Sequence, residues 1–445
     1  MDDYRHVADR IAAAIATGRL RPGDRLPPQR TFARRNGIAA STAARVYAEL
    51  GRRGLVVGEV GRGTFVRAAE PAPSPPLTEP SAARVDLELN HPSVPGQAGR
   101  LASSLERLQR PDVLEAALRP VGPTGTPAAR AVTADLLAHS GWRPAPEQIL
   151  FTGNGRQAIA GAVSALVPTG GRLAVEDLTY PVIKAIAARL GVTLTPIPTD
   201  RHGLCPEALA AAHRRAPFQA LYVQPTLHNP YGTTMPAQRR ADLAAALDDL
   251  GVHAIEDAVW AFLDEHAPPP LAAHAPDRTI LIDSLSKRLA PGLTVGIAVT
   301  PPALPEPLTT ALRSGAWTPS GYALEAVTGW ISDGTVAAIG AAKRADALAR
   351  GRIAASNLPG AGVRGAPCSY FRWWDLPAPW RAETFVAAAA REGIAVTPGA
   401  AFMVGAGRSP VPNAVRLGLA SPPPEVLEEA LTTLTKIAHS PPGTS

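Results

Sequence analysis

The chain has 445 residues, about two to three times the length of a typical domain, which excludes a single small domain. Hydrophobic residues make up 46% of it and charged residues 18%, a balance that excludes an intrinsically disordered protein. No apolar run approaches the roughly 20 residues of a membrane helix, and the first residues lack the pattern of a signal peptide. We therefore expect a soluble, cytoplasmic, globular protein.

Charge is distributed unevenly along the chain. Residues 1–69 contain thirteen arginines, no lysine and six acidic side chains, a net charge of +7, whereas the whole chain carries +6. A small basic segment joined to a nearly neutral large one suggests a polyanion-binding module attached to another domain. On charge alone, a solvated helical surface explains the excess equally well.

A proline-rich stretch separates these two parts. Residues 70–80 contain five prolines in eleven positions and almost no apolar side chain to bury, which predicts a semi-rigid linker. We expect an N-terminal domain at 1–69, a linker at 70–84 and a large domain at 85–445.

Three helices and a short hairpin are predicted within the N-terminal domain. The helices are indicated by apolar residues at helical spacing, by proline in a first turn and by glycine after a last one. Two β-rich runs around a glycine-rich turn indicate the hairpin. The predicted helices are 6–16, 29–36 and 41–53, and the predicted strands are 55–57 and 64–66. This arrangement is typical of a winged helix-turn-helix.

Specific residues of this region resemble the DNA-binding domain of the GntR family. They are Tyr4, Gly18 to Leu20, Pro22 to Pro27, Arg30, Ala33, Thr42, Tyr47, Leu50, Gly54 and Gly61 to Val66. The resemblance implies that the helix at 41–53 enters the major groove of DNA. Ala39-Ala40 departs from the usual Ser-Arg of the family, which removes a cap hydroxyl and a base-reading arginine.

The same resemblance implies the DNA contacts. Ser41 and Thr42 would contact phosphates or base edges, and Arg30 and Arg45 would contact guanine or the DNA backbone. The Arg62-Gly63 tip of the wing would reach the minor groove. The alternative is a winged helix that makes protein contacts only.

The pattern changes after Val85, where apolar strands alternate with alanine-rich helices. Such alternation predicts an α/β domain with a parallel sheet covered by helices. The predicted strands are 148–152, 172–176, 220–223, 253–255 and 279–283, and the predicted helices are 157–166, 182–190 and 237–250.

Lys287 is one of only four lysines in the chain, and it follows a predicted strand in a run of small residues. A lysine in such a place is the kind that forms a Schiff base with an aldehyde cofactor. A surface lysine in a serine-rich turn is the alternative if no other segment agrees.

Five other segments agree with the cofactor interpretation. Asp257 ends a predicted strand, where its carboxylate suits the protonated ring nitrogen of pyridoxal phosphate. Asn229 offers an amide to the ring oxygen, and Tyr180 is expected to stack on the ring. The glycine-rich turn at 152–157 leads into a helix whose free amides suit a phosphate. Arg416 suits a carboxylate, which it would bind bidentately.

In this order and spacing, the set resembles fold-type I aminotransferases over about residues 85–440. The run Ser284 to Leu293 resembles the form found in the MocR subfamily of regulators, where such a domain follows a GntR domain. The resemblance implies a pyridoxal-phosphate-dependent transferase fold with a mostly parallel sheet and a small C-terminal α+β subdomain. It also implies a homodimer, usually domain-swapped.

The resemblance also assigns a role to each site residue. Lys287 would form the Schiff base, Asp257 would pair with the pyridine nitrogen, and Asn229 would face the ring oxygen. Arg416 would receive the carboxylate of an effector or substrate. The residues expected at the phosphate are Gly155, Arg156 and Ser284.

Three positions depart from the aminotransferase pattern around the cofactor. Thr294 stands where the family usually has a phosphate-binding arginine, Val121 where the partner subunit donates a tyrosine, and Trp260 where a tyrosine is common. We therefore expect weaker pyridoxal phosphate binding, unless Arg156 or Arg288 compensates. A pocket converted to another ligand is the alternative.

The function expected from these patterns is ligand-responsive transcription regulation. The winged helix would bind operator DNA, and the aminotransferase-like domain would sense pyridoxal phosphate, alone or with an amino-group or carboxylate effector. An active aminotransferase carrying a DNA-binding appendage remains the alternative. The two cysteines, Cys205 and Cys368, lie without CxxC spacing, and we expect no metal site and no disulfide framework.

Overall fold

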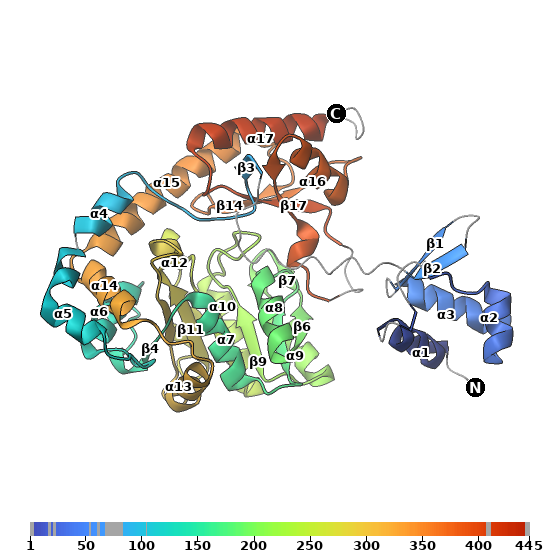
Figure 1. Cartoon of the computed structure of the whole chain (residues 1–445), viewed down its shortest axis with the longest axis horizontal. Coiled ribbons are helices and arrows are strands. Elements are labelled where there is room, and N and C mark those ends of the chain that lie inside the picture. Colours follow the sequence, from blue (N-terminus) through green and yellow to red (C-terminus); the bar gives the residue numbers. More distant parts are fainter. Residues whose placement is uncertain are drawn as a thin grey trace. The chain divides into compact units, whose positions relative to one another are not determined.

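Figure 1 shows the computed structural model of the chain. It describes residues 4–16, 19–20, 24–52, 55–59, 63–66, 83–103, 105–405 and 411–440. The chain forms two compact units, and the described residues up to Val66 belong to the first and those from Ala83 on to the second. Within these described ranges, no helix is long and apolar enough to cross a membrane.

The first unit is a winged helix-turn-helix, as the sequence predicts. Its elements are α1 (Tyr4–Ala16), α2 (Gln29–Asn36), α3 (Ala40–Arg52), β1 (Val56–Glu59) and β2 (Gly63–Val66). The two strands pair antiparallel, with Val57 opposite Phe65. Val46 and Leu50 of α3 are fully buried, because their spacing of four places both on the face that meets the other helices.

The turn between α2 and α3 is set by glycine and by one tyrosine. Gly37 ends α2 with a φ of +64°, and its amide donates to the carbonyls of Ala33 and Arg34, a conformation that glycine adopts without strain. Tyr47 of α3 packs edge-on against Phe32 of α2, with 5.2 Å between ring centroids, and its hydroxyl donates to the Pro27 carbonyl. Burial raises the pKa of Tyr47 to about 12. These contacts fix α3 relative to α2.

A seven-stranded sheet forms the centre of the second unit. Its strand order is β4-β12-β11-β10-β9-β5-β6, and only β12 runs antiparallel to its neighbours. The bounds are β4 Ile149–Thr152, β5 Arg172–Glu176, β6 Thr193–Ile197, β9 Ala220–Val223, β10 His253–Asp257, β11 Thr279–Ser284 and β12 Gly296–Val299. The central strands are buried throughout, as expected for a mostly parallel sheet covered on both faces.

Helices cover both faces of this sheet. One face packs against α7 (Gly155–Leu166), α8 (Pro181–Leu190) and α13 (Pro305–Ser314). The other face packs against α6 (Pro127–Leu137), α9 (Pro206–Arg215), α10 (Ala237–Leu250) and α14 (Gly321–Ser332). Shorter elements complete this part: α4 Gln97–Ser103, η1 Leu105–Gln109, α5 Pro111–Ala117, η2 Pro146–Gln148, β7 Thr199–Asp200, β8 Gly203–Leu204, η3 Ala261–Leu263, α11 Leu271–His274 and α12 Leu285–Arg288.

A small α+β subdomain lies beyond the long helix α15 (Thr335–Asn357), as the sequence predicts. Its antiparallel sheet has the order β13-β14-β17-β16. The bounds are β13 Val363–Arg364, β14 Phe371–Asp375, β15 Ile394–Ala395, β16 Thr397–Pro398, η4 Gly399–Phe402, β17 Ala414–Gly418, α16 Ala382–Arg391 and α17 Pro424–His439. The N-terminal strand β3 (Val85–Asp86) joins the subdomain by pairing in parallel with β15.

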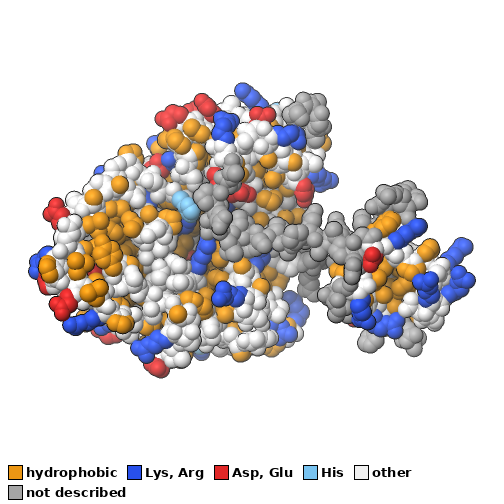
Figure 2. Space-filling model, in the orientation of Figure 1, with side chains coloured by type: hydrophobic (Ala, Val, Ile, Leu, Met, Phe, Trp, Pro, Cys, Tyr) orange, Lys and Arg blue, Asp and Glu red, His pale blue; other side chains and the backbone are white. Residues whose placement is uncertain are grey.

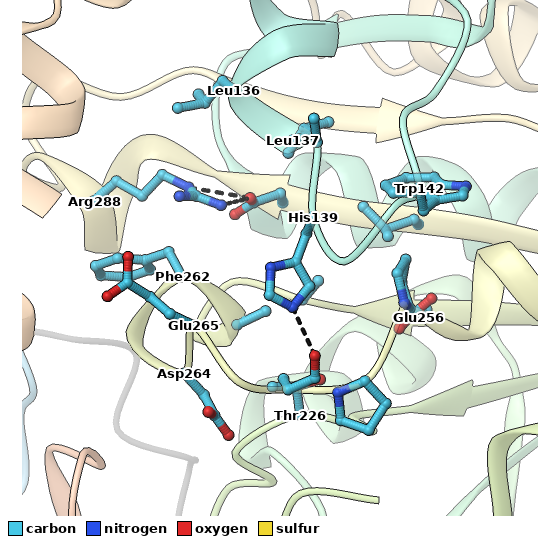
Figure 3. Close-up of a pocket in the computed structure, with 18 of the residues that line it drawn as sticks. Leu136, Leu137, His139, Trp142, Thr226, Glu256, Phe262, Asp264, Glu265 and Arg288 are labelled. Atoms are coloured by element: carbon cyan, nitrogen blue, oxygen red, sulfur yellow. Dashed lines mark hydrogen bonds and ion pairs between the residues drawn. The ribbon is translucent and has the colours of Figure 1, made fainter. Parts of the chain in front are cut away.

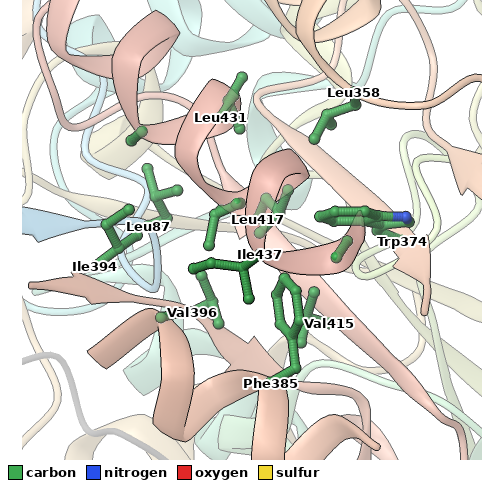
Figure 4. Close-up of a cluster of buried hydrophobic side chains, with 14 of the residues drawn as sticks. Leu87, Leu358, Trp374, Phe385, Ile394, Val396, Val415, Leu417, Leu431 and Ile437 are labelled. Carbon is green, nitrogen blue, oxygen red and sulfur yellow. The ribbon is translucent and has the colours of Figure 1, made fainter. Parts of the chain in front are cut away.

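The subdomain core combines the beginning and the end of the large unit (Figure 4). Leu87 packs there with side chains from α16, β17 and α17, among them Phe385, Leu417 and Leu431. All four of these side chains are fully buried. Residues about 330 positions apart therefore share one core, which no local sequence pattern announces.

Two observed boundaries extend beyond the predicted ones in a way that matters for the site. Helix α7 begins at Gly155, two residues before the predicted start, because Asn154 caps it by accepting from the Gln157 amide at 3.1 Å. Strand β10 continues to Asp257, because its parallel pairing with β11 extends to Ile282.

Truncation of the buried Leu431 tests the role of the subdomain core. Leu431→Ala removes a fully buried side chain and leaves a cavity, which should lower the free energy of unfolding by about 2–5 kcal/mol. Urea unfolding monitored by tryptophan fluorescence measures the change. Leu348→Ala, at a side chain that is 42% exposed, should change the same quantity by less than about 1 kcal/mol. Equal effects of the two substitutions would contradict the assigned core.

Candidate functional site

Lys287 lies on the short helix α12, directly after β11, at the edge of the sheet where the parallel strands end. Its Nζ donates to the Asn90 carbonyl at 2.7 Å and lies 4.9 Å from the centre of the Trp260 ring. Burial, and then the positive charges of Arg156 and Arg416, lower the pKa of Lys287 to about 7. A large share of this amine is therefore uncharged near neutral pH and can attack a carbonyl carbon.

Asp257 ends β10 at the same edge, and it is 2% exposed. Its Oδ2 accepts from the Tyr222 hydroxyl at 2.5 Å and from Gln224 Nε2 at 2.9 Å, and its Oδ1 accepts from the Val259 amide at 3.2 Å. Burial raises the pKa of Asp257, and the hydrogen bonds from Tyr222 and Gln224 oppose that rise. The carboxylate is thus held in one orientation by donors from β9 and the residues that follow it.

Asn229 is connected to Asp257 through Gln224. The main-chain N–H of Asn229 donates to Gln224 Oε1 at 3.2 Å, while Gln224 Nε2 donates to Asp257. Asn229 Oδ1 is buried, and none of the described residues forms a hydrogen bond with it. Since buried polar atoms normally have partners, this oxygen is available to a donor from outside the chain.

Three hydroxyl groups meet beside the start of α7. Ser284 Oγ, Ser286 Oγ and Thr294 Oγ1 lie 2.8–3.0 Å from one another. Gly155 approaches this cluster so closely that a Cβ added to it would lie 3.0 Å from Ser284 Cβ. The first amides of a helix have no partner inside the helix, so the hydroxyl cluster and α7 together form a donor-rich cup suited to an anion.

Arg416 reaches the site from β17 of the subdomain. It is 8% exposed, and its Nη2 donates to the Glu88 carbonyl at 2.7 Å and to Thr397 Oγ1 at 3.3 Å. Its Nε is buried, and no residue that the structure describes accepts from it. Burial lowers the pKa of Arg416 to about 10, so the guanidinium remains charged at neutral pH and keeps a free donor for an acceptor such as a carboxylate.

Tyr180 and Arg156 lie between these groups. Tyr180 precedes α8, and burial raises its pKa while its hydrogen bond and charge interaction with Arg156 oppose the rise. Tyr180 also interacts electrostatically with Asp257 and Arg416. The fold therefore brings together all eight residues that the sequence analysis assigns to cofactor or effector: Gly155, Arg156, Tyr180, Asn229, Asp257, Ser284, Lys287 and Arg416.

Arg288 is not in a position to serve the anion cup, which corrects the expectation that it compensates for Thr294. Its guanidinium donates to Asp283 Oδ2 at 2.8 Å and lies 5.0 Å from the Phe262 ring. Side chains alternate between the faces of a strand, so Asp283 and Ser284 point to opposite faces. Because Arg288 pairs with Asp283, its guanidinium lies on the face of the sheet opposite the anion cup.

A cavity of about 200 Å³ lies on that opposite face (Figure 3). Glu256, which alternates with Asp257 along β10, lines it together with His139 and the Asp283–Arg288 pair. The lining groups are already paired: His139 Nε2 bonds to the Ala267 carbonyl at 2.8 Å, and Glu256 accepts from two amides of α11. None of the eight assigned residues lines this cavity.

Sequence reasoning missed several residues of the site. Ser286 and Gln224 belong to its hydrogen-bond network, and Tyr222 supports Asp257. Lys343, from α15, donates to the carbonyls of Lys287 and Leu289 and so supports the turn that carries the lysine. Only Ser286 had a visible signal, the Ser-x-Ser-Lys spacing. Among the described residues, no cluster of His, Cys, Asp or Glu is suited to a metal ion, and both cysteines are free.

The winged helix places its predicted DNA-contacting residues as follows. Arg30 on α2 and Ser41 and Arg45 on α3 are exposed, and Thr42 is partly buried. The Arg45 guanidinium lies 4.1 Å from the centre of the Tyr4 ring. Figure 2 shows basic side chains on the surface of this unit. Gly63, with a φ of +121°, starts β2, and Arg62 lies outside the described residues.

Comparison with known proteins agrees with both halves of this description. Residues 85–434 match the family model of class I and II aminotransferases, and residues 3–66 match that of bacterial regulatory proteins of the gntR family. The HTH-type transcriptional regulator YdeF of Bacillus subtilis is 29% identical over 438 residues, which cover 98% of this chain and 94% of the relative. The pyridoxine biosynthesis transcriptional regulator PdxR of Corynebacterium glutamicum is 29% identical over 316 residues, 66% of this chain and 65% of the relative.

Among solved structures, LysN, an α-aminoadipate aminotransferase of Thermus thermophilus, matches with a TM-score of 0.70 at 24% identity. The match covers 80% of this chain and 92% of that one, and it shows a shared fold. The chain belongs to the class I and II aminotransferase family. A GntR-type DNA-binding domain precedes the aminotransferase domain, which is the domain arrangement of the MocR regulators.

Replacement of Arg45 tests the DNA-binding surface. Arg45→Ala removes an exposed cation from the predicted recognition helix and should weaken binding by about 1–3 kcal/mol where the contact is to guanine. The measurement is a titration of the full chain against a DNA duplex selected by the wild-type protein from a random pool. Arg110→Ala, at an exposed arginine of the second unit, is the control and should leave affinity unchanged. Unchanged affinity of Arg45→Ala would remove Arg45 from the interface.

Proposed function

We propose that this protein is a transcription regulator whose DNA-binding winged helix is controlled by pyridoxal 5′-phosphate bound in the aminotransferase domain. The observation that carries the proposal is the site around Lys287, a lysine of lowered pKa flanked by Asp257 and an anion cup, in a chain that begins with a GntR domain. A relative named as a regulator of pyridoxine biosynthesis supports the same ligand class.

The residues present fit pyridoxal phosphate group by group. Lys287 offers an amine to the aldehyde, and Asp257 offers a buried carboxylate to a protonated ring nitrogen. The unpartnered amide oxygen of Asn229 supports a role in accepting a hydrogen bond from the ligand. The hydroxyl cluster at Ser284 and the amides at the start of α7 offer donors to a phosphate. When bound, this cofactor supplies an electron-withdrawing ring to an attached amine.

The chain's own residues set how tightly such a ligand is held. Tyr222 and Gln224 keep the Asp257 carboxylate oriented, so its attraction for a ring cation costs no reorganisation. The anion cup contains neutral hydroxyls where an arginine would add a positive charge and a bidentate pair of donors, so the cup attracts a phosphate less strongly. We infer that binding depends largely on Lys287 and is readily reversed, which suits a sensor.

Arg416 gives the site a second binding function. Its unpartnered Nε and its remaining charge suit the carboxylate of an amino acid or similar effector. An amino-acid effector whose carboxylate binds Arg416 and whose amino group binds the ligand beside Lys287 would bridge the sheet and the subdomain.

The second candidate function is an active aminotransferase with a DNA-binding appendage. The presence of Lys287, Asp257 and Arg416 in one site favours it, because these groups suffice to bind an aldehyde cofactor and an amino acid. Continued turnover of an amino acid and keto acid pair would support the enzyme. Ligand-dependent DNA binding without turnover would support the regulator.

We also propose that the protein acts as a cytoplasmic homodimer. Leu114 of α5, Leu118 just after it and Tyr322 of α14 are 40%, 84% and 51% exposed, and α5 packs against α14. Figure 2 shows hydrophobic side chains gathered over this region. Such a patch is typical of a surface that a second chain covers.

The first test loads the full chain with pyridoxal phosphate. Wild type should develop a visible absorption band whose rate of appearance rises with pH through the Lys287 pKa of about 7 and levels off above it, because the uncharged amine of Lys287 is the reacting form. Its affinity for the selected DNA duplex should change on loading. Lys287→Ala should develop no band and show no change in DNA affinity.

Lys184→Ala is the matched control, because Lys184 is a partly buried lysine that donates to carbonyls of the 401–403 turn. It should behave like wild type. A wild-type protein that develops no band with pyridoxal phosphate would refute the proposed ligand, and a band without any change in DNA affinity would refute the proposed regulation.

The second test asks whether the hydroxyl cluster binds the phosphate group or another part of the ligand. Thr294→Val removes one hydroxyl of the cup and keeps the shape of the side chain, so the dissociation constant of pyridoxal phosphate should rise about 10- to 100-fold. Binding of pyridoxal, which lacks the phosphate, should not change. Calorimetric titration of both ligands gives the comparison.

Thr300→Val controls for loss of a threonine hydroxyl elsewhere, since Thr300 donates to the Gln148 carbonyl away from the cup. If Thr294→Val weakens pyridoxal and pyridoxal phosphate equally, the hydroxyl does not contact the phosphate.

A further inference from the structure

The two cations of the candidate ligand site bind main-chain carbonyls of one short segment. We call residues 85–91 the leading segment, because they follow the predicted linker. Lys287 Nζ donates to the Asn90 carbonyl, and Arg416 Nη2 donates to the Glu88 carbonyl, each at 2.7 Å. Successive carbonyls of an extended chain point in opposite directions, so these alternate ones face the site together.

The intervening carbonyls of the leading segment accept hydrogen bonds from residues of the subdomain that lie outside the candidate ligand site. The Leu87 carbonyl accepts from the Gly418 amide at 2.6 Å, and the Leu89 carbonyl accepts from Ser421 Oγ at 2.8 Å. Gly418 permits this approach, because a Cβ there would lie 2.8 Å from the Leu89 carbonyl oxygen. This side of the segment therefore stays attached to the subdomain.

The start of the leading segment is anchored independently of the site. The amides of Val85 and Leu87 donate to the carbonyls of Gly393 and Ala395, both at 2.9 Å. The two side chains are 3% and 0% exposed, and Figure 4 shows Leu87 within the subdomain core. The beginning of the segment thus moves with the subdomain.

The bond from Lys287 to Asn90 crosses between two parts of the second unit. Lys287 is carried by the turn after β11 of the seven-stranded sheet, whereas Asn90 is held by the subdomain through its Oδ1, which accepts from the Ala420 amide at 3.2 Å. The bond from Arg416 to Glu88 lies within the subdomain. The Lys287 bond therefore joins the leading segment to the sheet. Its donor, Nζ, is also the atom that is proposed to react with a ligand.

We propose that the Lys287–Asn90 hydrogen bond is a ligand-sensitive tie between the sheet and the subdomain, and that its loss transmits occupation of the site to the chain that leads to the winged helix. The inference rests on the proposed function and adds how the site is coupled to the linker. It requires no contact between the two units, because the chain itself is continuous from the linker into β3.

The chemistry of the amine explains why the tie responds to a carbonyl ligand. When Nζ forms a C=N bond to the ligand, the carbonyl oxygen leaves as water with two amine hydrogens. An ammonium group carries three hydrogens, and the nitrogen of the new bond carries at most one. Lys287 then keeps at most one donor, and its hold on the Asn90 carbonyl is weakened or lost. A ligand carboxylate also competes with the neutral Glu88 carbonyl for Arg416, because a charged acceptor is stronger.

Residue-resolved hydrogen–deuterium exchange on the full chain tests the tie, with pyridoxal phosphate as the probe. Loading should accelerate exchange of the Glu88, Leu89 and His91 amides by about tenfold or more, because the segment opens more readily without the tie. The amides of Val85 and Leu87 should keep their rates, since their partners lie in the subdomain. These two amides are controls within the same peptide.

Lys287→Met supplies the second arm of the experiment. It keeps a long side chain but removes every N–H, so exchange at residues 88–91 should be fast without ligand and should not respond to pyridoxal phosphate. Its affinity for the selected DNA duplex should equal that of loaded wild type. Lys184→Met removes a comparable lysine-to-carbonyl bond elsewhere and should leave residues 88–91 as in unloaded wild type.

The outcomes separate this inference from the proposed function. Absence of a visible band on loading refutes the ligand. A band accompanied by unchanged or slower exchange at residues 88–91 overturns the tie while the binding of pyridoxal phosphate stands. Slow exchange in Lys287→Met overturns it as well.

Discussion

The parallel pairing of β10 with β11 is the constraint on which the candidate site depends. This pairing brings the ends of both strands to one edge of the sheet, so Asp257 and the turn that carries Lys287 lie close together. The antiparallel partner of β11, β12, begins two residues after Thr294 and so returns that hydroxyl to Ser284. A change in this register would separate the carboxylate, the amine and the anion cup at once.

Placing the site at this edge has electrostatic consequences. Lys287 is buried near Arg156 and Arg416, and burial first, then the repulsion from these two cations, lowers the pKa of the lysine. Binding of an anionic ligand would be favourable for the same reason, because its negative charge offsets the repulsion among Lys287, Arg156 and Arg416. Main-chain carbonyls of Glu88 and Asn90 provide partial compensation. Affinity for a ligand and attachment of the leading segment are therefore competing uses of the same cations.

The subdomain connects this competition with the rest of the chain. Its core contains Leu87 as well as the strands and helices of the C-terminal residues, and Arg416 extends from its sheet into the site. The first and the last residues of the large unit are thus packed into one core and move together. Under the proposed function, such a regulator needs no separate signalling element, because residues 88 and 90 already contact the two cations proposed to bind the ligand.

The sequence by itself determined the class of both units and most of their elements. The predicted bounds of β5, β9 and α10 agree with the structure, because alternating apolar runs and glycine or proline boundaries are local signals. Local pattern also identified three candidates: Lys287, one of only four lysines and placed after a predicted strand, Asp257 at the end of an apolar run, and Arg416. Their roles remain predictions.

Only the tertiary structure decided which groups serve these candidates. Tyr222 and Gln224 orient Asp257 from the neighbouring strand and the residues after it, Arg288 turned out to pair with Asp283 on the opposite face, and Lys287 binds Asn90 across about 200 positions. The last contact uses a backbone carbonyl, which every residue possesses and which leaves no trace in the order of side chains. Such partnerships arise from the pairing of strands and the packing of the subdomain, so they exist only once distant segments have met.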